Sequence, residues 1–164
     1  MVMRSCLVYC EGRRDKNFFQ ALKGVSQFKH HTKGWVFHIE SGSGRSPETV
    51  LRQCRQFMGG RDFQLILCLI DVDALKTQHG DKWEERMKEL NEKYPEIKII
   101  WQYDCAEDEY RNVLTEKSGK NRINRLVLKN IKRFVNSPLW NRILAPIKER
   151  SIELRGAEAR EKDT

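Results

Sequence analysis

Residues 63–73 of this 164-residue chain read FQLILCLIDVD. The nearly unbroken apolar run at 63–70 is typical of a strand that is covered on both faces, as strands are in the parallel sheets of α/β proteins. Asp71 and Asp73 follow the run directly. The stretch therefore predicts a buried parallel strand that brings two carboxylates to one edge of a sheet.

Similar patterns on both sides of this run predict the rest of the fold. Strand-like segments lie at 4–10, 35–40 and 97–103, and helical patterns lie at 15–22, after Ser46-Pro47, at 81–94 and around 110–114. Alternation of strands and helices indicates an α/β domain with a mostly parallel four-stranded sheet flanked by helices, here over residues 1–116. Ligands of such sheets bind beyond the carboxyl ends of the strands.

Acidic residues follow three of the predicted strands. Glu11 comes after the first strand, Asp71 and Asp73 come after the third, and the fourth is followed by Asp104, Glu107, Asp108 and Glu109. Carboxylates of neighbouring strands would repel each other, and a cation would offset this repulsion. Because all the donors are oxygens, Mg²⁺ or Mn²⁺ is favoured over zinc. If the backbone stays extended, Asp71 and Asp73 face the same side and one ion.

The Asp-x-Asp pair by itself leaves several classes open. The same pair after an apolar strand occurs in phosphatases, in glycosyltransferases and at ordinary helix caps. Phosphatases of the haloacid-dehalogenase type place it after the first strand, whereas here it follows the third, so this class is disfavoured. The loop at 41–46 (SGSGRS) either cradles a phosphate through its N–H groups or is a plain connection.

The net charge of +8 is concentrated near the C-terminus. Residues 1–116 hold 18 basic and 18 acidic side chains, whereas residues 117–155 hold 11 basic and two acidic ones. Two helices are expected there, at 121–135 and 138–150, as a basic extension packed on the domain, and 156–164 is expected to be a disordered tail. In the first helix an apolar stripe would dock on the domain, and the basic residues would face outward: Arg122, Arg125, Lys129, Lys132 and Arg133.

This charge distribution indicates a polyanionic partner, most often a nucleic acid. Contacts to phosphates would make binding weaken steeply with salt. The alternative is a solvated helix surface without a ligand. The five cysteines match no zinc spacing and indicate reduced thiols in a cytoplasmic protein, and no apolar run is long enough to cross a membrane.

Two segments, CLVYCEGRRD at 6–15 and LILCLIDVD at 65–73, resemble the TOPRIM family, and VYCEGRRDKNFFQAL is most like its OLD and RloB-like nucleases. The resemblance covers roughly residues 4–114. It implies a Rossmann-like TOPRIM domain in which Glu11, Asp71 and Asp73 are the metal-binding acids. A later acid contributes to the metal site in OLD-like members, and Glu107 or Glu109 would take that place here.

The function that this resemblance implies is Mg²⁺-dependent phosphodiester chemistry on DNA or RNA, most simply a small nuclease. Asp71 and Asp73 would hold the ion, and Glu11 would bind a second ion or act as general acid or base. Three basic residues after Glu11 would contact phosphate or form a solvated first helical turn: Arg13, Arg14 and Lys16.

The second hypothesis is a TOPRIM-like binding module that retains affinity for metal and nucleic acid but does not cleave. Such a module would act in a larger complex, with a protein partner or as a homo-oligomer. The short chain favours the module, whereas the complete set of one Glu and an Asp-x-Asp favours the enzyme.

Overall fold

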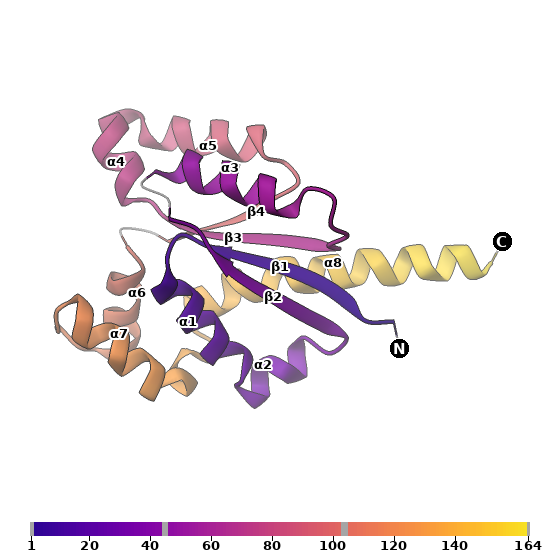
Figure 1. Ribbon diagram of the computed structural model, residues 1–164. Coiled ribbons are helices and arrows are strands. Elements are labelled where there is room, and N and C mark those ends of the chain that lie inside the picture. The colour runs from indigo at the N-terminus through magenta and orange to yellow at the C-terminus, as the bar shows by residue number, and fades with distance from the viewer. Residues whose placement is uncertain (1, 44–45, 103–104, 164) are drawn as a thin grey trace.

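The computed structural model describes residues 2–43, 46–102 and 105–163 (Figure 1). They form a four-stranded, all-parallel sheet between two layers of helices, which confirms the predicted α/β class in a Rossmann-like arrangement. The strands are β1 (Arg4–Cys10), β2 (Trp35–Ser41), β3 (Leu65–Asp71) and β4 (Lys98–Gln102). The helices are α1 (Arg13–Lys23), α2 (Ser26–His31), α3 (Pro47–Met58), α4 (Asp73–His79), α5 (Trp83–Lys93), α6 (Ala106–Leu114), α7 (Lys120–Lys129) and α8 (Pro138–Lys162), with short 3₁₀ turns η1 (Gly80–Lys82) and η2 (Ile131–Phe134).

The strand order is β2-β1-β3-β4, so the chain leaves β1 first towards one edge of the sheet and later towards the other. The topological switch point therefore lies between β1 and β3. Cys10 pairs with Leu69, and Asp71 pairs with Gln102, so β1, β3 and β4 finish side by side along the same rim of the sheet, the one formed by the carboxyl ends of the strands. Both chain ends lie at the other end of the sheet, towards the amino ends of the strands (Figure 1). Ligands of open α/β sheets bind at such switch points.

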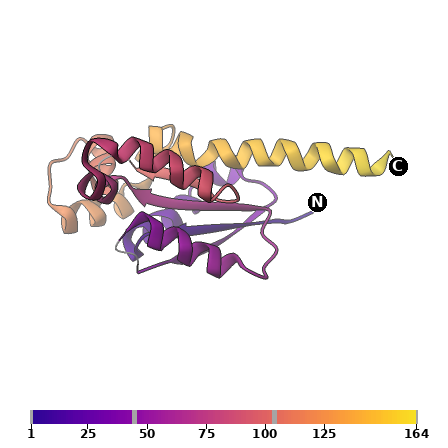
Figure 2. The same ribbon diagram turned by 90° about the horizontal axis from the view of Figure 1, so that it is seen from above.

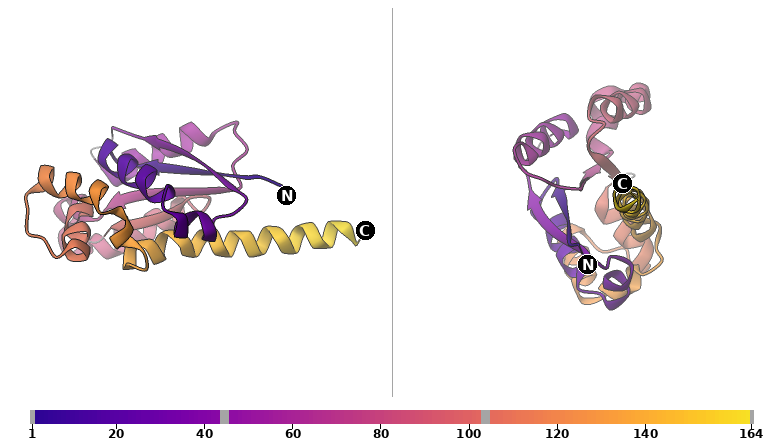
Figure 3. Two further views of the ribbon diagram at one scale, coloured as in Figure 1. Left: turned by 90° about the horizontal axis from the view of Figure 1, so that it is seen from below. Right: turned by 90° about the vertical axis from the view of Figure 1, so that its right-hand side faces the viewer.

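Each face of the sheet has its own apolar core because side chains alternate along a strand. Leu67 and Leu69 of β3 enter the core under α1, α2, α6, α7 and α8, whereas Ile66 and Cys68 enter the core under α3, α4 and α5. The end-on view in Figure 3 shows α3 and α5 on one side of the sheet and α8 on the other. The prediction that β3 is covered on both faces is confirmed, and all five cysteines of the chain are free and buried.

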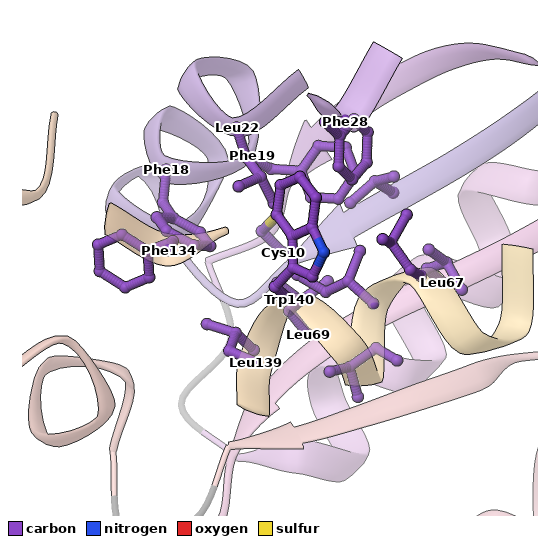
Figure 4. Close-up of a cluster of buried hydrophobic side chains, with 14 of the residues drawn as sticks. Cys10, Phe18, Phe19, Leu22, Phe28, Leu67, Leu69, Phe134, Leu139 and Trp140 are labelled. Atoms are coloured by element: carbon purple, nitrogen blue, oxygen red, sulfur yellow. The ribbon is translucent and has the colours of Figure 1, made fainter. Parts of the chain in front are cut away.

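The basic C-terminal segment completes one of these two cores. Trp140 of α8 packs edge-on against Phe28 of α2, with ring centroids 5.6 Å apart, in the cluster that Figure 4 shows. Ile123 and Val127 of α7 and Phe134 of η2 are buried in the same cluster. The predicted docking of 117–155 is therefore seen, but the 116/117 boundary does not separate two cores.

Residues 156–162 are helical, and the expectation of a disordered tail at 156–164 is corrected to that extent. Helix α8 continues to Lys162 and extends along and beyond the sheet (Figure 2). Its last turns are rich in Ala, Glu, Arg and Lys, which are strong helix formers. Ser151 accepts a hydrogen bond from the Trp35 indole at 2.8 Å, and Glu158 pairs with Arg4 at 3.1 Å.

Two other predicted helices differ in extent from those observed. The helix expected at 121–135 breaks at Asn130, whose side-chain amide donates to the carbonyl of Leu126 at 2.8 Å, and η2 follows. The helix expected at 81–94 is α5, which begins at Trp83 because the 3₁₀ turn η1 precedes it. Gly80, the C-cap of α4, has a positive φ of 53°. In the part of the chain that the structure describes, no helix combines the length and apolarity needed to span a bilayer.

Candidate functional site

Glu11 and Asp71 lie side by side at the switch point. Glu11 follows β1 and extends its ladder, since its backbone N–H donates to the Leu69 carbonyl at 3.2 Å. Its side chain then takes the next position, because Oε2 accepts a hydrogen bond from the backbone N–H of Asp71 at 3.0 Å. The carboxylate thus replaces the strand carbonyl that would otherwise pair there, which fixes both acids at the edge of the sheet.

The Asp71 side chain joins β3 to α6. Its Oδ1 accepts from the backbone N–H of Ala106, the first residue of α6, at 3.1 Å. That bond favours the ionised form, but burial and the negative charges of Asp15, Glu11 and Glu107 together outweigh it. The pKa of Asp71 is consequently raised to about 8. Burial, opposed by the bond from Asp71, also raises the pKa of Glu11.

Asp15 belongs to the same group, although the sequence reasoning did not select it. Its side chain is buried beneath α1, where Tyr110 donates a hydrogen bond to Oδ1 at 3.5 Å. Burial and the charges of Glu11 and Glu107 raise the pKa of Asp15 to about 7. The sequence does contain an indication that Asp15 is buried. Asp15 precedes Phe18 by three residues and Phe19 by four, so the three side chains lie on the same buried stripe of the helix. A carboxylate at a core-facing helix position is rare without a function or a partner.

Of the two late acids suggested by the resemblance, Glu107 lies in this group. Glu107 is buried in the first turn of α6, and its Oε1 lies 3.3 Å from the Asn124 amide nitrogen and 3.8 Å from Arg14. Glu109 instead pairs with Arg142 of α8. The acidic turn expected after the fourth strand is a helix start from Ala106 on, and Asp104 lies outside the described residues.

Asp73 does not extend from the strand beside Asp71 as expected for an extended Asp-x-Asp. Val72 has helical dihedral angles, φ −78° and ψ −19°, and its carbonyl accepts from Lys76 as α4 begins. The reason is local, since the Val72 side chain is buried and its N–H donates to the Gln102 carbonyl at 3.0 Å. Asp73 is therefore the exposed first residue of α4, while Asp71 is half-buried. Its charge still contributes to the raised pKa of Glu11.

The donor set at this edge suits a hard divalent cation. Glu11, Asp15, Asp71 and Glu107 offer oxygens only, and the negative charges of neighbouring acids add to burial in raising the pKa values of Glu11, Asp15 and Asp71. Within 2–43, 46–102 and 105–163, however, no three His, Cys, Asp or Glu side chains are gathered as a ready metal-binding group. Glu11 and Asp71 are engaged by backbone N–H groups, as described above, and Asp15 is engaged by the backbone N–H of Gly12.

Gln102 is a further polar side chain at this edge that the sequence reasoning did not select. It pairs with Asp71 in the ladder, so both side chains leave the same face of the sheet. It is completely buried, and among the described residues neither its amide oxygen nor its nitrogen has a hydrogen-bond partner. A buried amide without partners costs free energy, which a ligand at the edge would recover.

The basic residues near the acids come from α1 and α7. Arg13 and Arg14 are exposed on the first turn of α1, and Lys16 is half-exposed. The five predicted phosphate contacts on α7 and η2 are all exposed: Arg122, Arg125, Lys129, Lys132 and Arg133. Lys120, which had not been selected, acts electrostatically on Glu11 and opposes the rise in its pKa.

Arg142 of α8 pairs with Glu109 of α6, but Arg150 further along α8 lies elsewhere. Arg150 donates to the Gln64 carbonyl at 2.8 Å, near the amino end of β3. Figure 3 shows α6 and α7 at the end of the molecule that is opposite both termini, whereas α8 leads away from them. The excess positive charge of 117–155 is therefore divided between two places. One is the acidic edge formed by Glu11, Asp15, Asp71 and Glu107, and the other is the opposite end of the sheet.

Together these features define an α/β protein of Rossmann-like topology with an acidic candidate site at its switch point. Comparisons with protein-family models, with curated proteins and with solved structures each find no match for the chain.

Proposed function

We propose that this protein carries out divalent-metal-dependent phosphodiester chemistry on nucleic acid, as a small nuclease of the TOPRIM type. One observation carries the proposal: Glu11, Asp15, Asp71 and Glu107 converge at the switch point of the sheet with positive helices beside them. The pKa values of Glu11, Asp15 and Asp71 are raised, and acids with raised pKa values in such a place are typical of functional sites. The Glu-Gly and Asp-x-Asp sequences that resemble the family supply two of these acids.

Glu11, Asp71 and Glu107 are the residues that would hold Mg²⁺ or Mn²⁺, and Asp73 at the start of α4 would add its negative charge beside Glu11. Such an ion, when bound, neutralises charge on a phosphoryl oxygen and on the leaving oxygen. Glu11 is suited to move a proton at Oε1, because Oε2 is already engaged by the Asp71 N–H and because burial raises its pKa. Arg13 and Lys16 on the first turn of α1 would orient the phosphate backbone.

The test is cleavage of labelled single- and double-stranded DNA and RNA with Mg²⁺, Mn²⁺ or EDTA. Asp71→Asn preserves the shape of the side chain and removes its charge. Asp81→Asn is the matched control, because Asp81 is exposed on η1. We expect metal-dependent cleavage by the wild type and by the control, and none by Asp71→Asn. Equal cleavage by all three proteins would show that a contaminant or another site is responsible.

A second candidate is the binding module without catalysis. It is favoured by the hydrogen bonds that already occupy Glu11 and Asp71, since both side chains then act as links between β1, β3 and α6. In that case nucleic acid binds with the salt dependence of a basic surface and no substrate is cleaved. The same assay, run beside a binding titration, separates the two functions.

A further inference from the structure

A pocket opens between α1 and α7, next to the acidic edge. Its volume is about 340 Å³, in the range of roughly 300–1,000 Å³ usual for small-ligand sites. Arg14 and Asn17 line it from α1, and Asn121, Asn124 and Arg125 line it from α7. The helices are joined across it by a hydrogen bond of 2.6 Å from Arg14 to the Asn121 amide oxygen.

The polar part of this lining has the chemistry of a nucleobase edge. An Asn side chain offers both donors and an acceptor, as the hydrogen-bonding edge of a base does. The Asn17 side chain is exposed and its amide makes no hydrogen bond to any described residue, and the Asn121 bond to Arg14 uses the Asn121 oxygen and leaves its nitrogen available. These groups can therefore pair with an incoming base without breaking an existing contact.

The rest of the lining is apolar. Phe18 and Val127 are buried and form the inner wall, and Leu128 borders the pocket with 44% of its surface exposed. Among the described residues, Leu128 is not part of the apolar core that the other apolar side chains of α7 join. Apolar side chains beside polar groups match the two parts of a base, its face and its edge.

Two lining residues connect this pocket to the acidic edge. Arg14 and Asn124 both contact Glu107, at 3.8 Å and 3.3 Å. A base in the pocket would thus be followed along its strand by a phosphate close to the buried acids. Arg125 adds a positive charge at the pocket for the phosphate on the other side.

We propose that the pocket between α1 and α7 binds an unpaired nucleobase, so that the substrate of this protein is a single-stranded nucleic acid. The proposal rests on the function proposed above and specifies its substrate. A base in a duplex is stacked and paired, and extruding it costs free energy that a single strand does not spend. Single strands are accordingly bound in preference to duplexes.

The experiment measures binding in EDTA, where no metal-dependent cleavage takes place. Fluorescence anisotropy compares a labelled single-stranded oligonucleotide, its duplex, and an abasic strand with the same backbone. The double variant Asn17→Ala/Leu128→Ser removes one polar and one apolar part of the lining. Asn141→Ala/Ile152→Ser makes the same changes at exposed positions of α8 and is the control.

We expect the wild type to bind the single strand more tightly than the duplex or the abasic strand. The pocket variant should lose roughly tenfold in single-strand affinity, in line with the loss of one base contact, with little change for the abasic strand. The control should match the wild type. Equal wild-type affinity for the abasic and normal strands, or an equal loss for all ligands in the pocket variant, overturns the proposal.

Failure of this inference is distinct from failure of the proposed function. Metal-dependent cleavage that depends on Asp71, together with unchanged single-strand preference in the pocket variant, refutes the pocket alone. Absence of cleavage together with loss of single-strand preference in the pocket variant supports the pocket and refutes the nuclease. A wild type that binds none of the oligonucleotides refutes both.

Discussion

The carboxylate of Glu11 accepts a hydrogen bond from the backbone N–H of Asp71 at 3.0 Å and so closes the gap between the ends of β1 and β3. Two residues 60 positions apart in the chain are thereby held at the switch point of the sheet. The bond is made by the side chain of one acid and the backbone of the other, so their carboxylates stay close without sharing a proton donor. The hydrogen bond that Glu11 accepts can therefore be separated from its negative charge by substitution.

Glu11→Gln keeps an oxygen that can accept from the Asp71 N–H, whereas Glu11→Ala leaves that N–H without its partner. We expect Glu11→Ala to lower the free energy of unfolding by about 1–3 kcal/mol and Glu11→Gln to change it much less. Both variants should lose metal-dependent cleavage, because both lack the charge. Urea denaturation and the cleavage assay provide the two measurements.

The control for this pair is Glu84→Ala, at an exposed position of α5. It should change the free energy of unfolding by no more than about 0.5 kcal/mol. A Glu11→Gln variant as unstable as Glu11→Ala would contradict the role assigned to the hydrogen bond.

The metal-free protein should become less stable as the pH rises from about 4 to 8. Asp15 and Asp71 have pKa values of about 7 and about 8 in the folded protein, against 3.8 for an ordinary Asp. In this window the folded state holds more protons than the unfolded state, so the free energy of unfolding falls with increasing pH. The stabilisation is complete below about pH 4 and is lost as the pH passes through the folded values. Thermal unfolding in EDTA across the range measures it.

Asp15→Asn and Asp71→Asn should each flatten this pH profile, and at pH 8 each should be more stable than the wild type. The neutral amide resembles the protonated carboxyl that the folded state prefers. Mg²⁺ should stabilise the wild type most at pH 8, where the acids are ionised. A pH profile of the wild type that is flat in EDTA would contradict the raised pKa values.

Replacing basic residues of α7 should weaken nucleic-acid binding and its dependence on salt. For Arg122→Ala/Lys129→Ala we expect the slope of log K against log salt to fall by about 0.7 for each phosphate contact to a single strand that is removed. The measurement is affinity by anisotropy at several salt concentrations. Arg155→Ala/Lys162→Ala on the distal part of α8 is the control and should leave the slope unchanged. An equal effect of both pairs would indicate attraction by net charge alone.

Helix α8 should prove essential for the stability of the domain. Trp140 is 2% exposed and packs against Phe28, so Trp140→Ala is expected to cost about 3–5 kcal/mol of unfolding free energy. Ile152→Ala, 12 residues further along the same helix and 63% exposed, should cost about 0.5 kcal/mol or less. Similar losses in urea denaturation would contradict the assignment of α8 to the core.

Local patterns were sufficient for most of the secondary structure. The apolar run at 63–70 predicted β3, and Ser46-Pro47 predicted the start of α3, where Ser46 does accept a hydrogen bond from the Thr49 N–H. The break at Asn130 is not visible in the apolar spacing, because that spacing continues through the residue that ends the helix. The end of α8 was misplaced because Gly156 was taken as the start of disorder, although helix formers surround it.

The sequence by itself determined that acids follow the parallel strands and that the positive charge is concentrated in 117–155. It did not determine which acids meet. Asp15 and Glu107 join Glu11 and Asp71 only because α1 and α6 pack on the same face of the sheet, whereas Asp73 is turned onto α4 by the burial of Val72. Alternation along a strand and spacing along a helix are local properties that a sequence displays. The distance between two carboxylates depends on helix packing, and so does the raised pKa that results from it, which is why only the tertiary structure decided the composition of the site.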